Sequence, residues 1–529
     1  MSSMVRGYLT VNGRRVHYRR MGEGPPVVML HGSPGDSAML EEEMHAASQG
    51  FTCFALDTPG FGGSDPLRGE TLTVRDLAQA TAEAMAALQL PPCRVYGTHT
   101  GAAIGVELGV GWPEQVSGLV LEGLPAFTER EISLFFEGYF APLVVDPLGG
   151  HFTSTWVRFL DQFTWFPWVS RHVSRLNPVD RPTPEEIDHW VSMFYRSCKT
   201  YGPAYRAACY YGQAAITAAA ALERPCVFMA SAEDMLFPHL DRLPPLREGQ
   251  RIERLAYDPP AKFAAIARFL AELPGEPNGE PIAPATTLSG ADPAIGFVGS
   301  ADRQVFLRAY GDPTRPAVIL LHDAPATGLA LQVLARSLAG DAYVLVPDLP
   351  GVGETPAPQD QQPILEAAAD AIAAVADSLA LDQFRIGALG LGCAPAAVFA
   401  ARGDPRLAAV LLESPPEPSA ALAEAIAPDL ALTPEGSHWL KAWLMLRDNE
   451  IYQPWFDGAV AAQRKVQGNF DAGWLHDQTV ALMKSRATYS RLPRAAALFD
   501  LSESLSAAAA PVSVAQTGDL ATLIISNLR

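Results

Sequence analysis

A histidine lies between two glycines directly after an apolar run of the sequence. The run CRVY is followed by Gly97-Thr98-His99-Thr100-Gly101. An imidazole titrates near neutral pH, so a histidine that follows a buried strand can act as a general base, a proton shuttle or a nucleophile. Such a base needs a carboxylate to orient it, and two candidates follow other apolar runs, Glu122 and Asp234. The pattern predicts acid–base chemistry at His99.

The chain contains an internal repeat that includes this region. VVMLHGSPG (27–35) recurs as VILLHDAPA (318–326), DTPGFGGS (57–64) as DLPGVGET (348–355), and LVLEGLP (119–125) as VLLESPP (410–416), with matched positions 291 residues apart. A repeat of this length indicates two copies of one domain. The same offset places Gly390 opposite His99, so the second copy has no reactive side chain at this position.

Two later blocks extend the repeat and define its limits. GGHFTSTWVRFLDQFTWFPW (149–168) matches GSHWLKAWLMLRDNEIYQPW (436–455), and RPCVFMASAED (224–234) resembles APVSVAQTGDL (510–520). Between the copies, residues 273–296 are rich in Pro and Gly and predict a linker. The predicted domains are therefore 1–272 and 297–529. The second copy stops shortly after Asp519, so we expect it to lack the last strand and helix of the first.

Each copy alternates short apolar runs with amphipathic stretches. PPVVML, FTCFAL, CRVYG and SGLVLEG predict buried strands, while 72–90 and 260–273 have helical periodicity. This alternation predicts an α/β fold in which each copy is a mostly parallel, doubly wound sheet.

Three motifs occur in the same order in this framework. They are His-Gly-x-Pro-Gly after one strand, Asp-x-Pro-Gly-x-Gly-x-Ser after the next, and Gly-x-x-x-Gly between a strand and a helix. On these motifs the sequence resembles the α/β-hydrolase superfamily, over nearly all of domain one and most of domain two. The resemblance implies helical caps at about 126–222 and 417–508. It also implies that His99 and Gly390 occupy the position of the nucleophilic serine.

The resemblance further implies which groups surround His99. The backbone N–H groups of Ser33 and Thr100 would form an oxyanion hole, which the loss of the serine does not remove. The family places its acid at the position of Asp234 or of Glu122, and both remain open. Its own histidine should follow the last strand, but RLAYDPP (254–260) contains none. His151 in the cap is then either a pocket-lining candidate or a packing residue.

The bulk properties limit the classes of partner. The net charge of −19 disfavours nucleic acid and anionic membranes, and no stretch of about 18 apolar residues occurs, so we expect a soluble, cytoplasmic protein. The six cysteines have no CxxC spacing, which predicts neither disulfides nor a metal site. The glycines of 387–392 lack the remaining features of a dinucleotide fingerprint, so no cofactor is expected.

Two functional hypotheses follow. In the first, the chain is a hydrolase that cleaves an ester, lactone, amide or activated C–C bond of a small apolar molecule, with His99 replacing serine. In the second, it is a pseudoenzyme that serves as a ligand-binding or scaffold protein. The truncated second domain would leave a sheet edge or groove uncovered, which favours packing against domain one or a homodimer.

Overall fold

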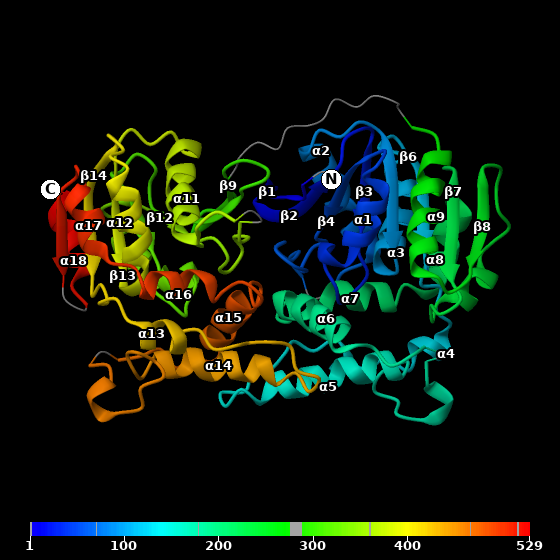
Figure 1. Cartoon of the computed structure of the whole chain (residues 1–529). Helices are drawn as coiled ribbons and strands as arrows, with labels where there is room; N and C mark the ends of the chain where they lie inside the picture. Colours follow the sequence, from blue (N-terminus) through cyan, green and yellow to red (C-terminus); the bar gives the residue numbers. More distant parts are fainter. Residues whose placement is uncertain are drawn as a thin grey trace. The chain divides into compact units, whose positions relative to one another are not determined.

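The chain forms two compact units, each with its own sheet (Figure 1). The computed structural model describes residues 3–69, 71–177, 179–275, 288–358, 361–465, 467–515 and 518–528. Unit 1 comprises Met1–Val144 and Ser154–Ala285, and unit 2 comprises Val145–Thr153 and Thr286–Arg529. Nothing in the repeat indicated that the short segment 145–153 groups with unit 2. Residues 276–287 of the predicted linker lie outside the described residues, and its last residues enter a strand.

Unit 1 contains an eight-stranded sheet in the order β1-β2-β4-β3-β5-β6-β7-β8. Its strands are β1 (Val5–Val11), β2 (Arg14–Met21), β3 (Pro26–Leu30), β4 (Thr52–Leu56), β5 (Cys93–Thr98), β6 (Val116–Glu122), β7 (Cys226–Ser231) and β8 (Gln250–Leu255). The strands from β4 to β8 in this order pair in parallel, and every residue of β3, β4, β5 and β7 is buried. Burial on both faces explains why these strands are continuous apolar runs.

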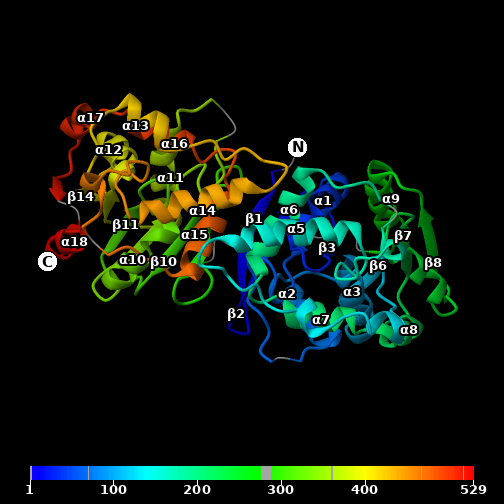
Figure 2. The same cartoon turned by 90° about the horizontal axis from the view of Figure 1, so that it is seen from below.

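The helices of unit 1 cover both faces of the sheet and one end of it. They are α1 (Glu41–Ala47), α2 (Val74–Ala87), α3 (Thr100–Gly111), α4 (Glu129–Ile132), α5 (Gly150–Thr164), α6 (Pro184–Ser197), α7 (Gly202–Cys209), α8 (Gly212–Ala221) and α9 (Pro259–Glu272). The first four residues of α5 group with unit 2 and the rest of the helix with unit 1. Helices α4 to α8 form the insertion between β6 and β7. Figures 1 and 2 show α5, α6 and α7 at one end of the sheet, as a cap.

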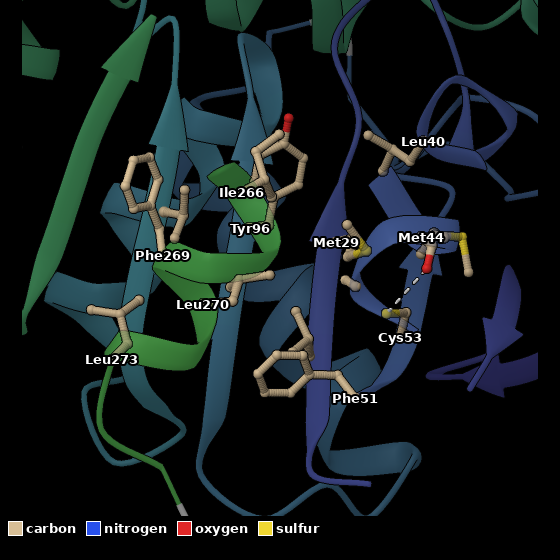
Figure 3. Close-up of a cluster of buried hydrophobic side chains, with 14 of the residues drawn as sticks. Met29, Leu40, Met44, Phe51, Cys53, Tyr96, Ile266, Phe269, Leu270 and Leu273 are labelled. Carbon is tan, nitrogen blue, oxygen red and sulfur yellow. Dashed lines mark hydrogen bonds between the residues drawn. The ribbon is translucent and has the colours of Figure 1, made fainter. Parts of the chain in front are cut away.

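One face of this sheet is covered by α9. Ile266, Phe269 and Leu270 of α9 are buried with Met29 of β3 and Tyr96 of β5 in a single apolar cluster (Figure 3). The predicted helices at 72–90 and 260–273 correspond to α2 and α9. The side chain of Asp258 caps α9 by accepting the Ala261 N–H at 3.1 Å.

Unit 2 repeats this architecture with seven strands, in the order β15-β14-β13-β11-β12-β10-β9. The strands are β9 (Ala294–Val298), β10 (Val305–Tyr310), β11 (Ala317–Leu321), β12 (Tyr343–Pro347), β13 (Phe384–Leu389), β14 (Leu407–Glu413) and β15 (Val512–Ala515). The helices are α10 (Gln332–Leu338), α11 (Ile364–Ser378), α12 (Cys393–Ala401), α13 (Ala420–Ala425), α14 (Ser437–Asn449), α15 (Ala472–Met483), α16 (Arg491–Ala497), α17 (Leu501–Ala507) and α18 (Leu520–Leu528).

The last elements of unit 2 differ from the sequence-based expectation in one respect. Within the described residues no strand corresponds to β8, but a helix does follow β15 directly. Leu520 and Ile524 of α18 are buried in one cluster with Leu320, the repeat counterpart of Met29. This helix therefore covers the sheet face that α9 covers in unit 1, and the expected loss of the helix is wrong. A short apolar helix removes the cost of exposing that face to water.

Candidate active site

The turn between β5 and α3 holds His99 in an unusual backbone conformation. Its φ is 49° and its ψ is −108°, a conformation that costs a residue with a side chain about 1–3 kcal/mol. The flanking glycines are required because a Cβ on Gly97 would lie 2.3 Å from the carbonyl oxygen of Gly101, and one on Gly101 would lie 2.0 Å from that of Leu30. Gly390 has the same positive φ, 51°, in unit 2. The close packing at the turn between β5 and α3 thus holds residue 99 at a positive φ.

The imidazole of His99 is paired with Asp234, which follows β7. Nε2 of His99 lies 2.9 Å from Oδ2 of Asp234, and Oδ1 of this carboxylate accepts the Leu236 N–H at 2.8 Å. The His99 side chain is 35% exposed and that of Asp234 is 10% exposed, so the base can be reached from solvent while its partner is fixed. Within the described residues, Nδ1 of His99 has no hydrogen-bond partner.

This pairing determines which nitrogen of His99 can act as a base. Neutral imidazole has one N–H donor and one acceptor nitrogen, and a carboxylate accepts only from the N–H. With Nε2–H directed to Asp234, Nδ1 carries the lone pair. Burial lowers the pKa of His99, but the charge and hydrogen bond of Asp234 outweigh burial and raise it above 6.5. The pKa of Asp234 is raised by burial and lowered further by His99, so that it lies below its ordinary value.

A glycine after β6 makes space for this pair. A Cβ on Gly123, whose φ is 60°, would lie 2.5 Å from Cδ2 of His99 and 2.8 Å from Oδ2 of Asp234. The repeat counterpart in unit 2, where there is no imidazole, is Ser414 with φ 50°. A serine therefore tolerates the same backbone there. This glycine-to-serine difference between the repeats is the sequence signal that could have located the pair.

The structure also brings Ser33 and Thr100 together. The Thr100 hydroxyl donates to the Ser33 hydroxyl at 2.9 Å. Thr100 is the first residue of α3, where backbone N–H groups have no partner within the helix. The loop before Ser33 is held by His31, whose Nε2 accepts the Thr58 N–H at 3.0 Å and whose Nδ1 lies 3.0 Å from the carbonyl oxygen of Gly32.

The cap is joined to this loop by an ion pair whose carboxylate is buried. Nε of Arg196, in α6, lies 2.6 Å from Oδ2 of Asp36, whose side chain is 1% exposed. Burial raises the pKa of Asp36, and Arg196 lowers it below its ordinary value. The ring of Trp190, also in α6, lies 3.5 Å from the position a Cβ on Gly35 would take. Helix α6 therefore lies against the loop that carries Ser33.

Glu122 has a different set of partners. Its Oε2 accepts a hydrogen bond from the Tyr96 hydroxyl, and its Oε1 lies 3.2 Å from Nζ of Lys262, which is also 3.9 Å from Oε1 of Glu43. His99 contacts Glu122 through the backbone, by an N–H to carbonyl bond of 2.9 Å. Of the two candidate acids, Asp234 is the one whose carboxylate contacts the imidazole of His99.

The counterpart of Glu122 in unit 2 explains why a glutamate recurs here. Oε2 of Glu413 accepts the N–H of Leu520, the first residue of α18, at 2.8 Å. Glu122 likewise binds Lys262 in the first turn of α9. Both glutamates therefore join the end of a central strand to the helix that covers the sheet. Lys262, Tyr96 and Glu43 were not predicted, although Lys262 lies two residues after the segment in which the family histidine was expected.

Burial makes Glu43 an acid that titrates near neutral pH. Burial raises the pKa of Glu43 to about 7, against the opposing effect of Lys262. A carboxyl whose folded pKa exceeds its ordinary value of 4.5 contributes stability below that value, and this stability is lost as the pH rises through about 7. We therefore expect Glu43 to reduce the free energy of unfolding by about 2 kcal/mol between about pH 5.5 and pH 8.

Substitution of Glu43 by glutamine tests this expectation. Glu43→Gln should abolish that part of the pH dependence, measured by urea unfolding at both pH values. Glu42→Gln, at the exposed neighbouring position of α1, should leave the wild-type dependence unchanged. Equal pH dependence of the wild type and Glu43→Gln would contradict the assignment.

His151 is not among the residues around His99. It belongs to the segment of 145–153 that groups with unit 2, where its Nε2 lies 3.1 Å from Nδ1 of His476. The residue is 3% exposed, and burial lowers its pKa to about 4. Trp443 packs edge-on against its ring at 5.3 Å. These contacts are those of a packing residue, and His151 is not part of the proposed site.

Membrane-spanning helices and metal clusters are both absent from the described part of the chain. None of the helices in the described ranges is both long and apolar enough to cross a membrane. Within the same ranges, no group of three or more His, Cys, Asp or Glu side chains is arranged to hold a metal ion.

Comparison with known proteins gives one family. The family model described as alpha/beta hydrolase fold matches residues 25–254 and 316–451. A proline iminopeptidase of Arabidopsis thaliana is 30% identical over 125 residues, which are 23% of this chain and 33% of that protein. A pimeloyl-[acyl-carrier protein] methyl ester esterase of Shewanella woodyi is 31% identical over 118 residues, 22% of this chain and 43% of that protein. The chain thus spans less than half the length of either relative.

Among solved structures, epoxide hydrolase A from Mycobacterium thermoresistibile aligns with a TM-score of 0.41 and 22% identity. The alignment covers 52% of this chain and all of that chain.

Proposed function

Since this chain belongs to the alpha/beta hydrolase fold family, we propose that unit 1 is a hydrolase in which His99 acts as the general base. The observation that supports this proposal is the 2.9 Å pairing of His99 with Asp234 at the turn after β5. A partly exposed imidazole oriented by a less exposed carboxylate is an arrangement suited to acid–base catalysis. A family member that lacks the serine can use this arrangement on water directly.

The proposed reaction needs no covalent enzyme intermediate. Nδ1 of His99 takes a proton from a water molecule, and the water oxygen bonds to the substrate carbonyl carbon. The resulting oxyanion accepts hydrogen bonds from the backbone N–H groups of Ser33 and Thr100. The bond to the leaving group then breaks, and the leaving group takes the proton from His99. The charge of Asp234 stabilises the imidazolium between these two steps.

The proposed substrates are small apolar molecules that contain an ester, a lactone, an amide or an activated C–C bond. The Shewanella woodyi relative is an esterase for a methyl ester and the Arabidopsis thaliana relative is a peptidase, so carbonyl substrates are the class with the most support. Apolar recognition is supported by the aromatic cluster of the cap, in which Phe127, Phe135 and Tyr139 are buried beside Leu236, two residues after Asp234.

An assay of the purified full chain tests the proposal. We expect hydrolysis of p-nitrophenyl butyrate above the buffer rate, and incubation in ¹⁸O-water should place the label in the released butyrate. A mass spectrum of the protein during turnover should show no added acyl group. If neither p-nitrophenyl esters, lactones nor anilides are hydrolysed, the proposal fails. An acyl group on His99 would replace the general-base mechanism with a nucleophilic one.

The second hypothesis, a protein without catalysis, is supported for unit 2. Gly390 offers no reactive group, and the cleft lined by the neighbouring residues Leu391 and Gly392 has only about 10 Å³ open. We therefore propose that unit 2 contributes no turnover, so activity should depend on unit 1 residues alone.

A further inference from the structure

Two residues around the turn differ between the two copies of the repeat. Gly32 is replaced by Asp323, and His99 is replaced by Gly390. Oδ1 of Asp323 accepts two backbone N–H groups, from Ala324 at 2.8 Å and from Leu391 at 2.8 Å. These residues are the repeat counterparts of Ser33 and Thr100. A single carboxylate oxygen thus binds both groups that would form the oxyanion hole.

The two exchanges depend on one another. A Cβ on Gly390 would lie 2.2 Å from Cγ of Asp323 and 2.3 Å from each of its carboxylate oxygens. The carboxyl group therefore occupies the space that the side chain of the turn residue takes in unit 1. There, the residue opposite is Gly32, and a Cβ on it would lie 3.3 Å from Cβ of His99. A carboxylate at 32 and a side chain at 99 would compete for this space, as Asp323 and Gly390 show in unit 2.

The backbone of the hole is held in the same way in both units. Nε2 of His322 accepts the Leu349 N–H at 3.3 Å, and its Nδ1 lies 3.1 Å from the carbonyl oxygen of Asp323. His31 makes the equivalent contacts with Thr58 and Gly32 in unit 1. The scaffold that orients the N–H groups is therefore retained although the reactive side chain is lost.

The surrounding cleft leaves little room for another ligand. It is lined mainly by apolar residues, among them Pro325, Val352, Leu482 and Leu492, and about 10 Å³ remains open, which is room for about one water molecule. Within the described residues, Asp323 forms no ion pair with a cation. The negative charge of Asp323 is thus held close to two N–H dipoles inside a nearly filled apolar cleft.

We propose that unit 2 retains an oxyanion-binding site whose occupant is the carboxylate of Asp323, and that this side chain excludes carboxylate and other oxyanion ligands from the site. The proposal concerns unit 2 and does not depend on turnover by unit 1. It predicts that the wild-type chain offers one such site to external ligands, and that restoring the glycine of the first repeat exposes a second.

The test follows the backbone amide of Leu391 by NMR in the full chain labelled with ¹⁵N-leucine. Burial raises the pKa of Asp323 to about 6, against the opposing effect of the Leu391 and Ala324 N–H groups, so the amide signal should move as the pH passes that value. The other titratable or charged groups around the carboxyl are His322, Cys393, Glu413 and Arg464. Their contribution is what persists in Asp323→Asn, which keeps an acceptor oxygen but cannot titrate.

Sodium acetate is the probe for the second part of the test, because it matches in size the carboxymethyl group that Asp323→Gly removes. In Asp323→Gly, acetate should shift the Leu391 amide signal in a saturable manner, whereas the wild type and Asp323→Asn should show no such shift. An equal response of wild type and Asp323→Gly, or no response of the folded Asp323→Gly protein, would overturn the proposal. If Asp323→Gly fails to fold, the pH response decides: a shift of the Leu391 amide signal as large in Asp323→Asn as in the wild type would also overturn the proposal.

Discussion

Replacement of His99 by glutamine is expected to lower kcat/KM for p-nitrophenyl butyrate by at least about 100-fold, the lower limit of what a general base usually contributes. The glutamine amide can still donate to Oδ2 of Asp234, so the pair keeps a hydrogen bond and the buried carboxylate keeps a partner. An amide nitrogen cannot accept a proton from water, and only the base is removed. Initial rates at saturating and limiting substrate measure the effect.

A histidine outside the site provides the matched control. His45 is exposed on α1, and His45→Ala should retain wild-type kcat/KM. The thermal unfolding midpoint of His99→Gln should also remain close to that of the wild type, which would separate loss of chemistry from loss of fold. If His99→Gln keeps more than about a third of the wild-type kcat/KM, His99 is not the base.

Replacement of Asp234 by asparagine is expected to cause a loss of similar size, about 100-fold or more in kcat/KM. The asparagine amide can donate to Nε2 of His99, which would move the imidazole proton to Nδ1. The nitrogen that should accept a proton from water would then be blocked. Measurement of kcat/KM in the same assay gives the magnitude.

The matched variant is Glu122→Gln, because it makes the same carboxylate-to-amide change at the other candidate acid. Glu122 is bound to Tyr96 and Lys262, so its loss should change the free energy of unfolding while kcat/KM stays within about threefold. If Glu122→Gln abolished turnover and Asp234→Asn did not, the roles of the two acids would be reversed.

Much of the fold could be predicted from the sequence because burial on both faces leaves a simple pattern. Apolar runs predicted β3, β4, β5 and β6, and helical periodicity over 72–90 predicted α2. The repeat located the turn at His99 and the matching turn at Gly390, which has no reactive side chain. The family and the two mostly parallel sheets are confirmed. Local pattern was sufficient here because the strands and helices are defined by nearby residues.

The details of the site required the three-dimensional structure. Glu122 ends β6 and Asp234 follows the neighbouring strand β7, so only side-chain direction decides which one reaches His99. The role of Lys262 depends on the packing of α9 against the sheet, and Asp323 meets Gly390 across 67 residues of sequence. The helix α18 was missed because its place depends on the apolar face it covers. In each case the missing information was a contact distant in sequence.

The pH dependence of kcat/KM tests the proposed base most directly. Activity requires neutral His99, so in the wild type kcat/KM should rise with pH and level off, with a midpoint above the ordinary histidine value of 6.5 because Asp234 raises the pKa of His99. In Asp234→Asn, the residual activity should have its midpoint at lower pH. A wild-type kcat/KM that does not change between about pH 5 and pH 9, or a midpoint that is unchanged in Asp234→Asn, would contradict the assignment of His99 and Asp234.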